Sequence, residues 1–366
     1  MPIKRLFILL LPFILIISVS AQSRKIISIP NIPGFQTLKC DFHMHTVFSD
    51  GTVWPTVRIE EAWEEGLDAI AITDHIEYRP HSKNVVGDHN SAFGIAEPLS
   101  KEKKIILIHG AEITRNMPPG HLNALFIKNA NLLDRDDAME AIREARDQGA
   151  FIFWNHPGWK VQQPDSTVWF NEHTTLLKNK MLHGIEVYNG EYFPEALEWA
   201  NEKKLTMFAN SDAHGPINTS DEHRPLTLVF AKSRTSGGIR EALFSRRTVA
   251  FFDNTLIGEA QYLDPFFFAS LEIDNSPLRI ENEVTKNISI KNNSDINYEL
   301  ELVQPGIGFD APEKVVLPPH RIVVLSLTGN SDEVGSMKNL DIYYKVSNLL
   351  VNSNENLIVT FTFQNN

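Results

Sequence analysis

The stretch LKCDFHMH, residues 38–45, decides how this chain of 366 residues is interpreted. Its apolar start, residues 38–42, is typical of a buried strand, and alternation along an extended chain places His43 and His45 on the same side. Two imidazoles placed in this way can bind one metal ion, although a single His-x-His pair is weak evidence. The interpretation therefore depends on the residue types at the ends of the other strands.

Apolar runs alternate with amphipathic stretches as far as about residue 264. The expected strands are residues 38–42, 69–73, 105–110, 122–127, 151–154, 184–188, 205–210 and 226–230. The expected helices are residues 56–65, 135–148, 193–203 and 238–245. Strands that alternate with helices favour an α/β fold with a parallel sheet, either barrel-like or doubly wound.

Residue types that bind metals stand just past the ends of several of these strands. They are His43, His45, Asp50, His75, Glu112, His121, His156, Asp212 and His214. In parallel α/β barrels this rim is where active sites are built. One histidine at a strand end is more often structural, but burying so many ionisable groups without a cation would cost roughly several kcal/mol each. Because no Cys is among them, the set favours Zn, Mn or Fe. Asp41 and Asp74 adjoin these positions, and we expect them to orient imidazoles rather than to bind metal.

At these residues the sequence resembles the PHP family, named for polymerase and histidinol phosphatase. The motifs are His43-Met44-His45, Thr73-Asp74-His75, His156 and Asp212-Ala213-His214, in the family's order. The resemblance covers residues 36–265. It implies a distorted (β/α)7 barrel that holds two to three divalent metal ions and hydrolyses phosphate esters.

The resemblance also implies a role for each residue. The first metal would take His43, His45, Glu112 and Asp212, the second Glu112, His121 and His156, and the third Asp50, His75 and His214. Glu112 would bridge, and a hydroxide activated by the metals would attack phosphorus without a Ser or Cys nucleophile. Glu112 and Asp212 are thus the expected catalytic carboxylates. Arg115 is a candidate clamp for a phosphate oxygen, the alternative being a solvated loop charge.

The charge of the chain restricts its substrates. Lys and Arg number 34 against 46 Asp and Glu, and the net charge of -12 argues against nucleic-acid binding, so we expect a small-molecule phosphate ester. No strongly basic segment marks a pocket for a dianionic phosphate, which favours a phosphodiesterase. Trp154, Trp159 and Tyr188 are candidates to pack against the second ester substituent, the alternative being a place in the core, which we favour for Trp154. The alternatives are a phosphomonoesterase of histidinol-phosphatase type and a noncatalytic, metal-dependent anion-binding protein.

The chain changes character after about residue 265, where Asn becomes frequent and helical periodicity vanishes. Short β-rich runs occur there at residues 288–290, 315–317, 322–327, 342–346 and 357–363. Short strands separated by turn residues predict a small all-β, sandwich-like domain over residues 266–366. We expect it to contribute no metal ligand.

Residues 1–21 have the pattern of a secretory signal peptide, with Lys4 and Arg5 before an apolar run and small residues before a cleavage site at Ala21. The alternative is an uncleaved anchor, but the apolar run is shorter than the roughly 20 residues of a spanning helix. We therefore expect an exported protein, periplasmic or extracellular, with no stable membrane insertion after cleavage. Residues 22–35 would form an N-terminal segment before the α/β domain.

Overall fold

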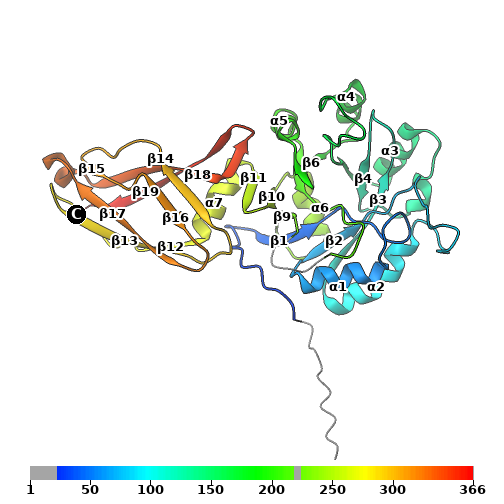
Figure 1. Cartoon of the computed structure of the whole chain (residues 1–366), viewed down its shortest axis with the longest axis horizontal. Helices are drawn as coiled ribbons and strands as arrows, with labels where there is room; N and C mark the ends of the chain where they lie inside the picture. Colours follow the sequence, from blue (N-terminus) through cyan, green and yellow to red (C-terminus); the bar gives the residue numbers. More distant parts are fainter. Residues whose placement is uncertain (1–22, 218–223, 366) are drawn as a thin grey trace, which may run out of the picture.

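The computed structural model describes residues 23–217 and 224–365. An α/β domain and a β-sandwich lie next to each other along the long axis of the molecule (Figure 1). The predicted signal peptide lies outside the described residues. Within the described ranges, no helix has the length and apolarity needed to cross a bilayer.

The α/β domain is built on a mixed sheet. Its strands follow one another across the sheet in the order β1 (Gln36–Asp41), β2 (Ala69–Ile72), β3 (Ile106–Ile113), β4 (Leu122–Leu125), β5 (Phe151–Trp154), β6 (Gly184–Asn189) and β8 (Thr206–Ala209). The expectation of a parallel sheet is wrong at β4, which runs antiparallel to both neighbours. The loop of residues 114–121 between β3 and β4 is too short for a parallel crossover, which needs about a dozen residues or more.

Two further strands complete the sheet and bring its ends together. β9 (Leu226–Ala231) runs antiparallel to β1, and β10 (Thr248–Phe252) runs antiparallel to β9. Thr227 Oγ1 accepts the amide hydrogen of Ala209 at 3.1 Å and donates to its carbonyl at 2.9 Å. β8 therefore joins β9 through a threonine side chain, which gives the distorted barrel that the family resemblance implies.

Helices pack around this sheet (Figure 1). They are α1 (Pro55–Glu64), α2 (Ser91–Lys103), α3 (Ala138–Asp147), α4 (Asn171–Lys178), α5 (Pro194–Lys203), α6 (Ser236–Phe244) and α7 (Ala260–Ala269). The start of α3 is later than predicted because Asp137 caps the helix by accepting the amide hydrogen of Glu140 at 2.9 Å. We did not expect α2, whose Gly94 and Pro98 weaken its helical pattern.

The β-sandwich predicted for the C-terminal region is confirmed. One sheet contains β12 (Leu271–Ile273), β13 (Thr285–Asn292), β17 (Ile322–Gly329) and β15 (Phe309–Asp310). The other contains β16 (Lys314–Leu317), β14 (Tyr298–Leu302), β18 (Asn339–Asn352) and β19 (Glu355–Gln364). Burial alternates along β13 and β19, as expected for strands with one face on a core.

The two domains share one sheet. β18 is long enough to reach β11 (Thr255–Gly258) of the α/β domain, and the two strands pair in parallel, with Leu256 opposite Leu349. β11 in turn pairs with β10, so the sheet continues from the sandwich into the barrel. Apolar side chains of both domains consequently belong to a single core cluster, which includes Phe267 and Phe361.

Candidate metal centre

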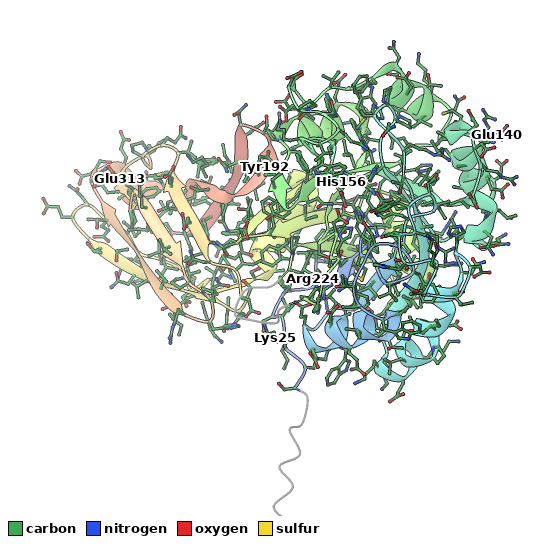
Figure 2. The ribbon with its side chains drawn as sticks, turned by 45° about the vertical axis from the view of Figure 1, so that its right-hand side comes forward. Lys25, Glu140, His156, Tyr192, Arg224 and Glu313 are labelled. Atoms are coloured by element: carbon green, nitrogen blue, oxygen red, sulfur yellow. The ribbon has the colours of Figure 1, made fainter. Side chains whose placement is uncertain are left out.

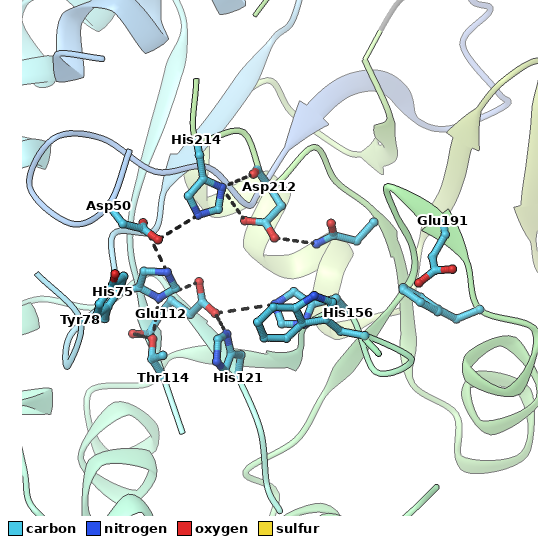
Figure 3. Close-up of a pocket in the computed structure, with 13 residues that line it drawn as sticks. Asp50, His75, Tyr78, Glu112, Thr114, His121, His156, Glu191, Asp212 and His214 are labelled. Atoms are coloured by element: carbon cyan, nitrogen blue, oxygen red, sulfur yellow. Dashed lines mark hydrogen bonds and ion pairs between the residues drawn. The ribbon is translucent and has the colours of Figure 1, made fainter. Parts of the chain in front are cut away.

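A pocket of about 450 Å³ opens at the carboxyl ends of the barrel strands (Figure 3). Seven of the nine predicted ligands line it, namely Asp50, His75, Glu112, His121, His156, Asp212 and His214. His43 and His45 lie beneath them and are fully buried. Short bridges between strand ends hold the ligand segments together, because Met44 pairs with Ala213 and His75 pairs with Glu112.

The ligand atoms gather into four adjoining groups, each with its atoms within 4.8 Å of one another. The groups are His43, His45 and Asp212; His43, Glu112 and His156; His75, Glu112 and His121; and His45, Asp50, His75 and His214. Among the described residues, these groups contain all nine predicted ligands and no other residue. Imidazole nitrogens and carboxylate oxygens at this spacing suit several divalent ions.

Glu112 stands at the centre of the groups. Its Oε2 lies 3.1 Å from His43 Nε2 and 3.3 Å from His45 Nε2. Its Oε1 lies 2.6 Å from His121 Nδ1 and 3.9 Å from His156 Nε2. One carboxylate therefore faces imidazoles from several strands, as a bridging ligand must.

Two other carboxylates complete the arrangement. Asp212 Oδ1 lies 2.9 Å from His45 Nε2, and the backbone of Asp212 is in the left-handed region at φ 52°. This conformation is uncommon for residues other than Gly, although Asp tolerates it, and it turns the chain sharply after β8. Asp50 lies 3.4 Å from His75 Nε2 and 3.3 Å from His214 Nε2, on the outer side of the pocket.

A glycine makes the Asp50 turn possible. A Cβ at Gly51 would lie 2.7 Å from the carbonyl carbon of His45 and 2.7 Å from the amide nitrogen of Thr46. Backbone atoms cannot move aside as a flexible side chain can. Gly51 therefore allows the turn to pack directly on the chain that carries His45.

The charges of the centre are strongly coupled. Burial raises the pKa of Glu112, but the nearby imidazoles of His75 and His43 outweigh it and hold that pKa well below its usual range. Burial opposes protonation of His45, yet hydrogen bonds to Asp212 and Glu112 raise its pKa to about 9. Burial opposes protonation of His43 as well, but the acidic surroundings raise its pKa, so positive charge on these two imidazoles balances the carboxylates, a task that divalent cations perform in a metal site.

Two unsatisfied atoms test whether the residues fit a cation. Glu112 Oε1 and His121 Nδ1 are buried and lie 2.6 Å apart, but neither makes a hydrogen bond of acceptable geometry among the described residues. Buried polar atoms without partners are rare, and those at functional sites often mark an ion. A cation bound by both atoms would satisfy them, so the donor set fits a metal centre.

Glu186 supports the centre, and the sequence interpretation missed it. The side chain is fully buried, and its Oε1 lies 2.9 Å from His43 Nδ1. Its Oε2 accepts the amide hydrogen of His156 at 2.7 Å. A carboxylate in this position orients the His43 ring with Nε2 toward the metal. The available signal was a glutamate between the apolar residues Ile185 and Val187 of strand β6.

Asp41 and Asp74 bind backbone amides, hydroxyl groups and, for Asp41, the Arg224 guanidinium rather than imidazoles, contrary to our expectation. Asp74 accepts the amide hydrogen of Thr46 and a hydrogen bond from the Ser49 hydroxyl, which fixes the turn before Asp50. Asp41 accepts from the hydroxyl of Ser211 at 2.6 Å, next to Asp212. Both carboxylates therefore fix the backbone segments that carry the candidate ligands.

The predicted role of Arg115 does not fit the structure. Its guanidinium pairs with Glu77 at 2.8 Å and donates to the backbone carbonyl of Asp136 at 3.1 Å. These groups line a separate polar pocket, and Arg115 is not among the residues that line the metal pocket. Arg224 (Figure 2) is buried, and its guanidinium pairs with the carboxylate of Asp41 at 3.0 Å.

The rest of the pocket wall is aromatic and polar. It consists of Tyr78, Thr114, Trp159, Asn189, Glu191 and Phe193. Of the three aromatic candidates, only Trp159 lines the pocket. Trp154 is fully buried, as we favoured, and Tyr188 stacks on Phe252 at 3.9 Å. None of the described residues that line the pocket is a lysine or an arginine.

Comparison with known proteins extends these observations. A PHP domain model matches residues 41–214. The crystal structure of a two-domain protein from Bacteroides vulgatus, described as containing a predicted PHP-like metal-dependent phosphoesterase, is 45% identical. The match covers 94% of this chain and 100% of that one, with a TM-score of 0.88. The chain belongs to the PHP family. All nine candidate ligands of this PHP protein lie inside the matched range, which ends at His214.

Two more distant relatives and a second domain model each match part of the chain. An uncharacterized protein of Methanocaldococcus jannaschii is 26% identical over 196 residues, 50% of this chain and 85% of that protein. A 5'-3' exoribonuclease of Haemophilus influenzae is 34% identical over 80 residues, 22% of this PHP chain and 25% of that enzyme. An Ig-like domain model matches residues 271–362, which form the β-sandwich.

Proposed function

We propose that this PHP protein is a metal-dependent phosphoesterase that hydrolyses phosphodiesters. The observation that carries the proposal is the set of four adjoining His and carboxylate groups at the floor of one pocket, with Glu112 shared by two of them. Two to three divalent ions held there, Mn, Zn or Fe, would supply charge stabilisation for phosphoryl oxygens and an activated water. The described relative from Bacteroides vulgatus supports the phosphoesterase class.

The protein's own residues would hold this chemistry in place. Glu112 and Asp212 supply negative charge where several cations must lie close together. Glu186 fixes the orientation of His43. The burial of His43 and His45 keeps bulk water away from the inner side of the centre.

The preference for a diester follows from charge and space. A monoester dianion needs cationic groups beyond the metals, and the described lining of the pocket offers neither lysine nor arginine. A diester carries one charge fewer. The part of the pocket beside Trp159 and Phe193 leaves room for its second substituent.

A direct comparison of rates tests the proposal. The purified full chain, loaded in turn with Mn, Zn and Fe, is given bis(p-nitrophenyl) phosphate and p-nitrophenyl phosphate at the same pH. We expect the diester to be cleaved faster. If the monoester is cleaved about ten times faster, the protein is a phosphatase. A tenfold ratio of rates corresponds to a difference of about 1.4 kcal/mol in activation free energy. Full metal occupancy without turnover of either ester would assign a noncatalytic binding protein.

We also propose that the protein is exported and acts on a small-molecule ester outside the cytoplasm. The pattern of residues 1–21 and the acidic balance of the chain support this. N-terminal sequencing of the protein from fractionated cells should give a chain that begins at Gln22. A start at Met1 in the cytoplasmic fraction would contradict the proposal.

A further inference from the structure

One wall of the pocket carries a carboxylate that the metal centre does not use. Glu191 lines the pocket on the side away from His75 and Asp50 (Figure 3). Its side chain is exposed, and no hydrogen bond or ion pair joins its carboxylate to another residue in the described parts of the chain. The group is therefore available to a ligand.

The hairpin formed by β6 and β7 (Glu191–Tyr192) fixes this carboxylate. Gly190, at φ 66°, makes the tight turn, and Asn189 pairs with Glu191 across it. Asn189 is itself held by a hydrogen bond of 2.8 Å to Glu186. The neighbouring pair, Tyr188 and Tyr192, stacks against Phe252 instead. Alternation along the strands therefore directs Asn189 and Glu191 to the pocket.

Two aromatic side chains, Trp159 and Phe193, line the pocket together with Glu191. Trp159 is 38% exposed and its ring centroid lies 5.2 Å from that of His156. Phe193 follows the hairpin and packs on the Trp159 loop, where a Cβ on Gly158 would lie 2.5 Å from the Phe193 ring. We call Trp159, Glu191 and Phe193 the outer subsite.

The outer subsite has the chemistry of a cation site. Aromatic faces attract ammonium groups through the ring quadrupole, and a carboxylate without a partner adds a full negative charge. No lysine or arginine among the described lining residues offsets that charge. An anionic substituent would be repelled here, while the phosphate itself would be held by the metal centre.

We propose that the outer subsite selects phosphodiesters whose second alcohol carries a positively charged alkylammonium group, as in choline or ethanolamine esters. This inference rests on the proposed function. Glu191 is then a specificity-determining residue: it contacts the substituent and leaves the reacting atoms to the metal centre.

A matched pair of substrates tests the inference. p-Nitrophenyl phosphorylcholine and p-nitrophenyl 3,3-dimethylbutyl phosphate have the same leaving group and nearly the same shape, but only the first has a cationic substituent. We expect the metal-loaded full chain to favour the choline ester in kcat/KM. Glu191→Gln should lower this preference by about fivefold, the upper range for an exposed ion pair, and Glu191→Lys should reverse it.

Glu195 supplies the control, since it is an exposed glutamate in the first turn of α5 that does not line the pocket. Glu195→Gln should leave the preference unchanged. Calorimetric binding of phosphocholine and of 3,3-dimethylbutyl phosphate to the metal-loaded chain gives the same comparison without turnover.

The outcomes separate the two proposals. If the wild type and both Glu191 variants hydrolyse the two esters with the same preference, the outer subsite is not a cation site, although the phosphodiesterase function stands. If no ester is hydrolysed at full metal occupancy, the function is wrong. The binding ratio then decides the inference alone, and equal affinities for the two ligands would overturn it.

Discussion

The guanidinium of Arg58 bridges the chain segments that carry His45 and His214. Its Nε donates to the carbonyl of His45 at 2.9 Å, and its terminal nitrogens donate to the carbonyls of Ala213 at 2.8 Å and Gly215 at 2.9 Å. Arg58 is fully buried in α1, where Glu61 accepts a further hydrogen bond from it at 2.7 Å. One side chain thus ties together two neighbouring segments that both carry candidate ligands.

Replacing Arg58 should weaken both the fold and the metal centre. Arg58→Met removes the bonds to both loops and leaves Glu61 buried without its cation, which costs about 3–5 kcal/mol. Urea unfolding measures that loss, and elemental analysis of the folded fraction should find fewer metal ions per chain.

Arg247→Met is the matched control for this variant. Arg247 is also buried and donates to a backbone carbonyl, that of Phe230, and pairs with Glu241. It lies away from the pocket lining. The control should lose stability while its folded fraction keeps the wild-type metal content. Equal metal loss in both variants would show that Arg58 has no particular role at the centre.

Glu112→Gln should abolish most of the activity without unfolding the protein. The substitution keeps the shape of a fully buried side chain but removes the charge shared among several imidazoles. Loss of a supporting partner typically costs 10–100-fold, so loss of a ligand should cost at least about 100-fold in kcat/KM. Circular dichroism checks the fold, and near-wild-type turnover would exclude Glu112 as a ligand.

Glu186→Gln should have a smaller effect than Glu112→Gln. The amide still reaches His43 and His156 but no longer favours one orientation of the imidazole by charge. We expect a loss of roughly 10–100-fold in metal affinity, measured by competition with a chelator of known affinity. Unchanged affinity would mean that Glu186 stabilises only the strand ends.

Arg115→Ala should leave turnover within about twofold of wild type, in the range of an exposed ion pair. The guanidinium is held by Glu77 and by a backbone carbonyl outside the metal pocket. Steady-state kinetics with the diester are sufficient for this test. A loss of a hundredfold would restore Arg115 as a phosphate clamp and would require its side chain to turn into the pocket.

His173 should make the protein sensitive to mild acid. Burial lowers its pKa to about 4, and the ring stacks on Trp154 at 3.7 Å. The unfolded chain takes up a proton near pH 6.5, whereas the folded chain resists until about pH 4. The contribution of His173 to the free energy of unfolding is therefore fully present above pH 6.5 and is lost as the pH falls toward 4.

The lowered pKa of His173 sets the size of this loss of stability. At about 1.36 kcal/mol per pKa unit, the free energy of unfolding should fall by about 3 kcal/mol between pH 7 and pH 4. His173→Gln keeps an amide near Pro119, whose carbonyl is 2.8 Å from His173 Nε2, but does not titrate. Denaturant unfolding at the two pH values should therefore show a smaller stability loss in the variant. Equal losses would mean that His173 is protonated in the folded state.

The candidate ligands could be predicted from the sequence because their positions follow from local patterns along single strands. The His43 and His45 pair follows from alternation along one strand, and the positions of Glu112 and Asp212 follow from the ends of two others. All of the predicted ligands meet in one place because strand ends share one rim. For these residues, knowing the strands was nearly enough to know the site.

Other features depend on contacts between distant residues. The pairing of Leu256 with Leu349 joins the two domains. The alternation of apolar and polar residues along each strand does not indicate which strand it pairs with. The direction of Arg115 depends on Glu77, a competing acceptor whose proximity only the fold creates. Glu186 lies inside an apolar strand, where its partner could not be inferred before His43 was placed beside it.

The continuous sheet limits how such a protein can be rearranged by recombination. The parallel pairing of β18 with β11 means that the Ig-like part supplies an edge strand to the barrel, and Asn201 of α5 also donates to the carbonyl of Val351 in β18 at 2.9 Å. An unrelated sandwich fused at residue 265 would lack that strand and would leave β11 with an open hydrogen-bonding edge, a template for aggregation. The Ig-like part is therefore a structural continuation of the barrel sheet, and exchanging it for another sandwich should destabilise the α/β domain.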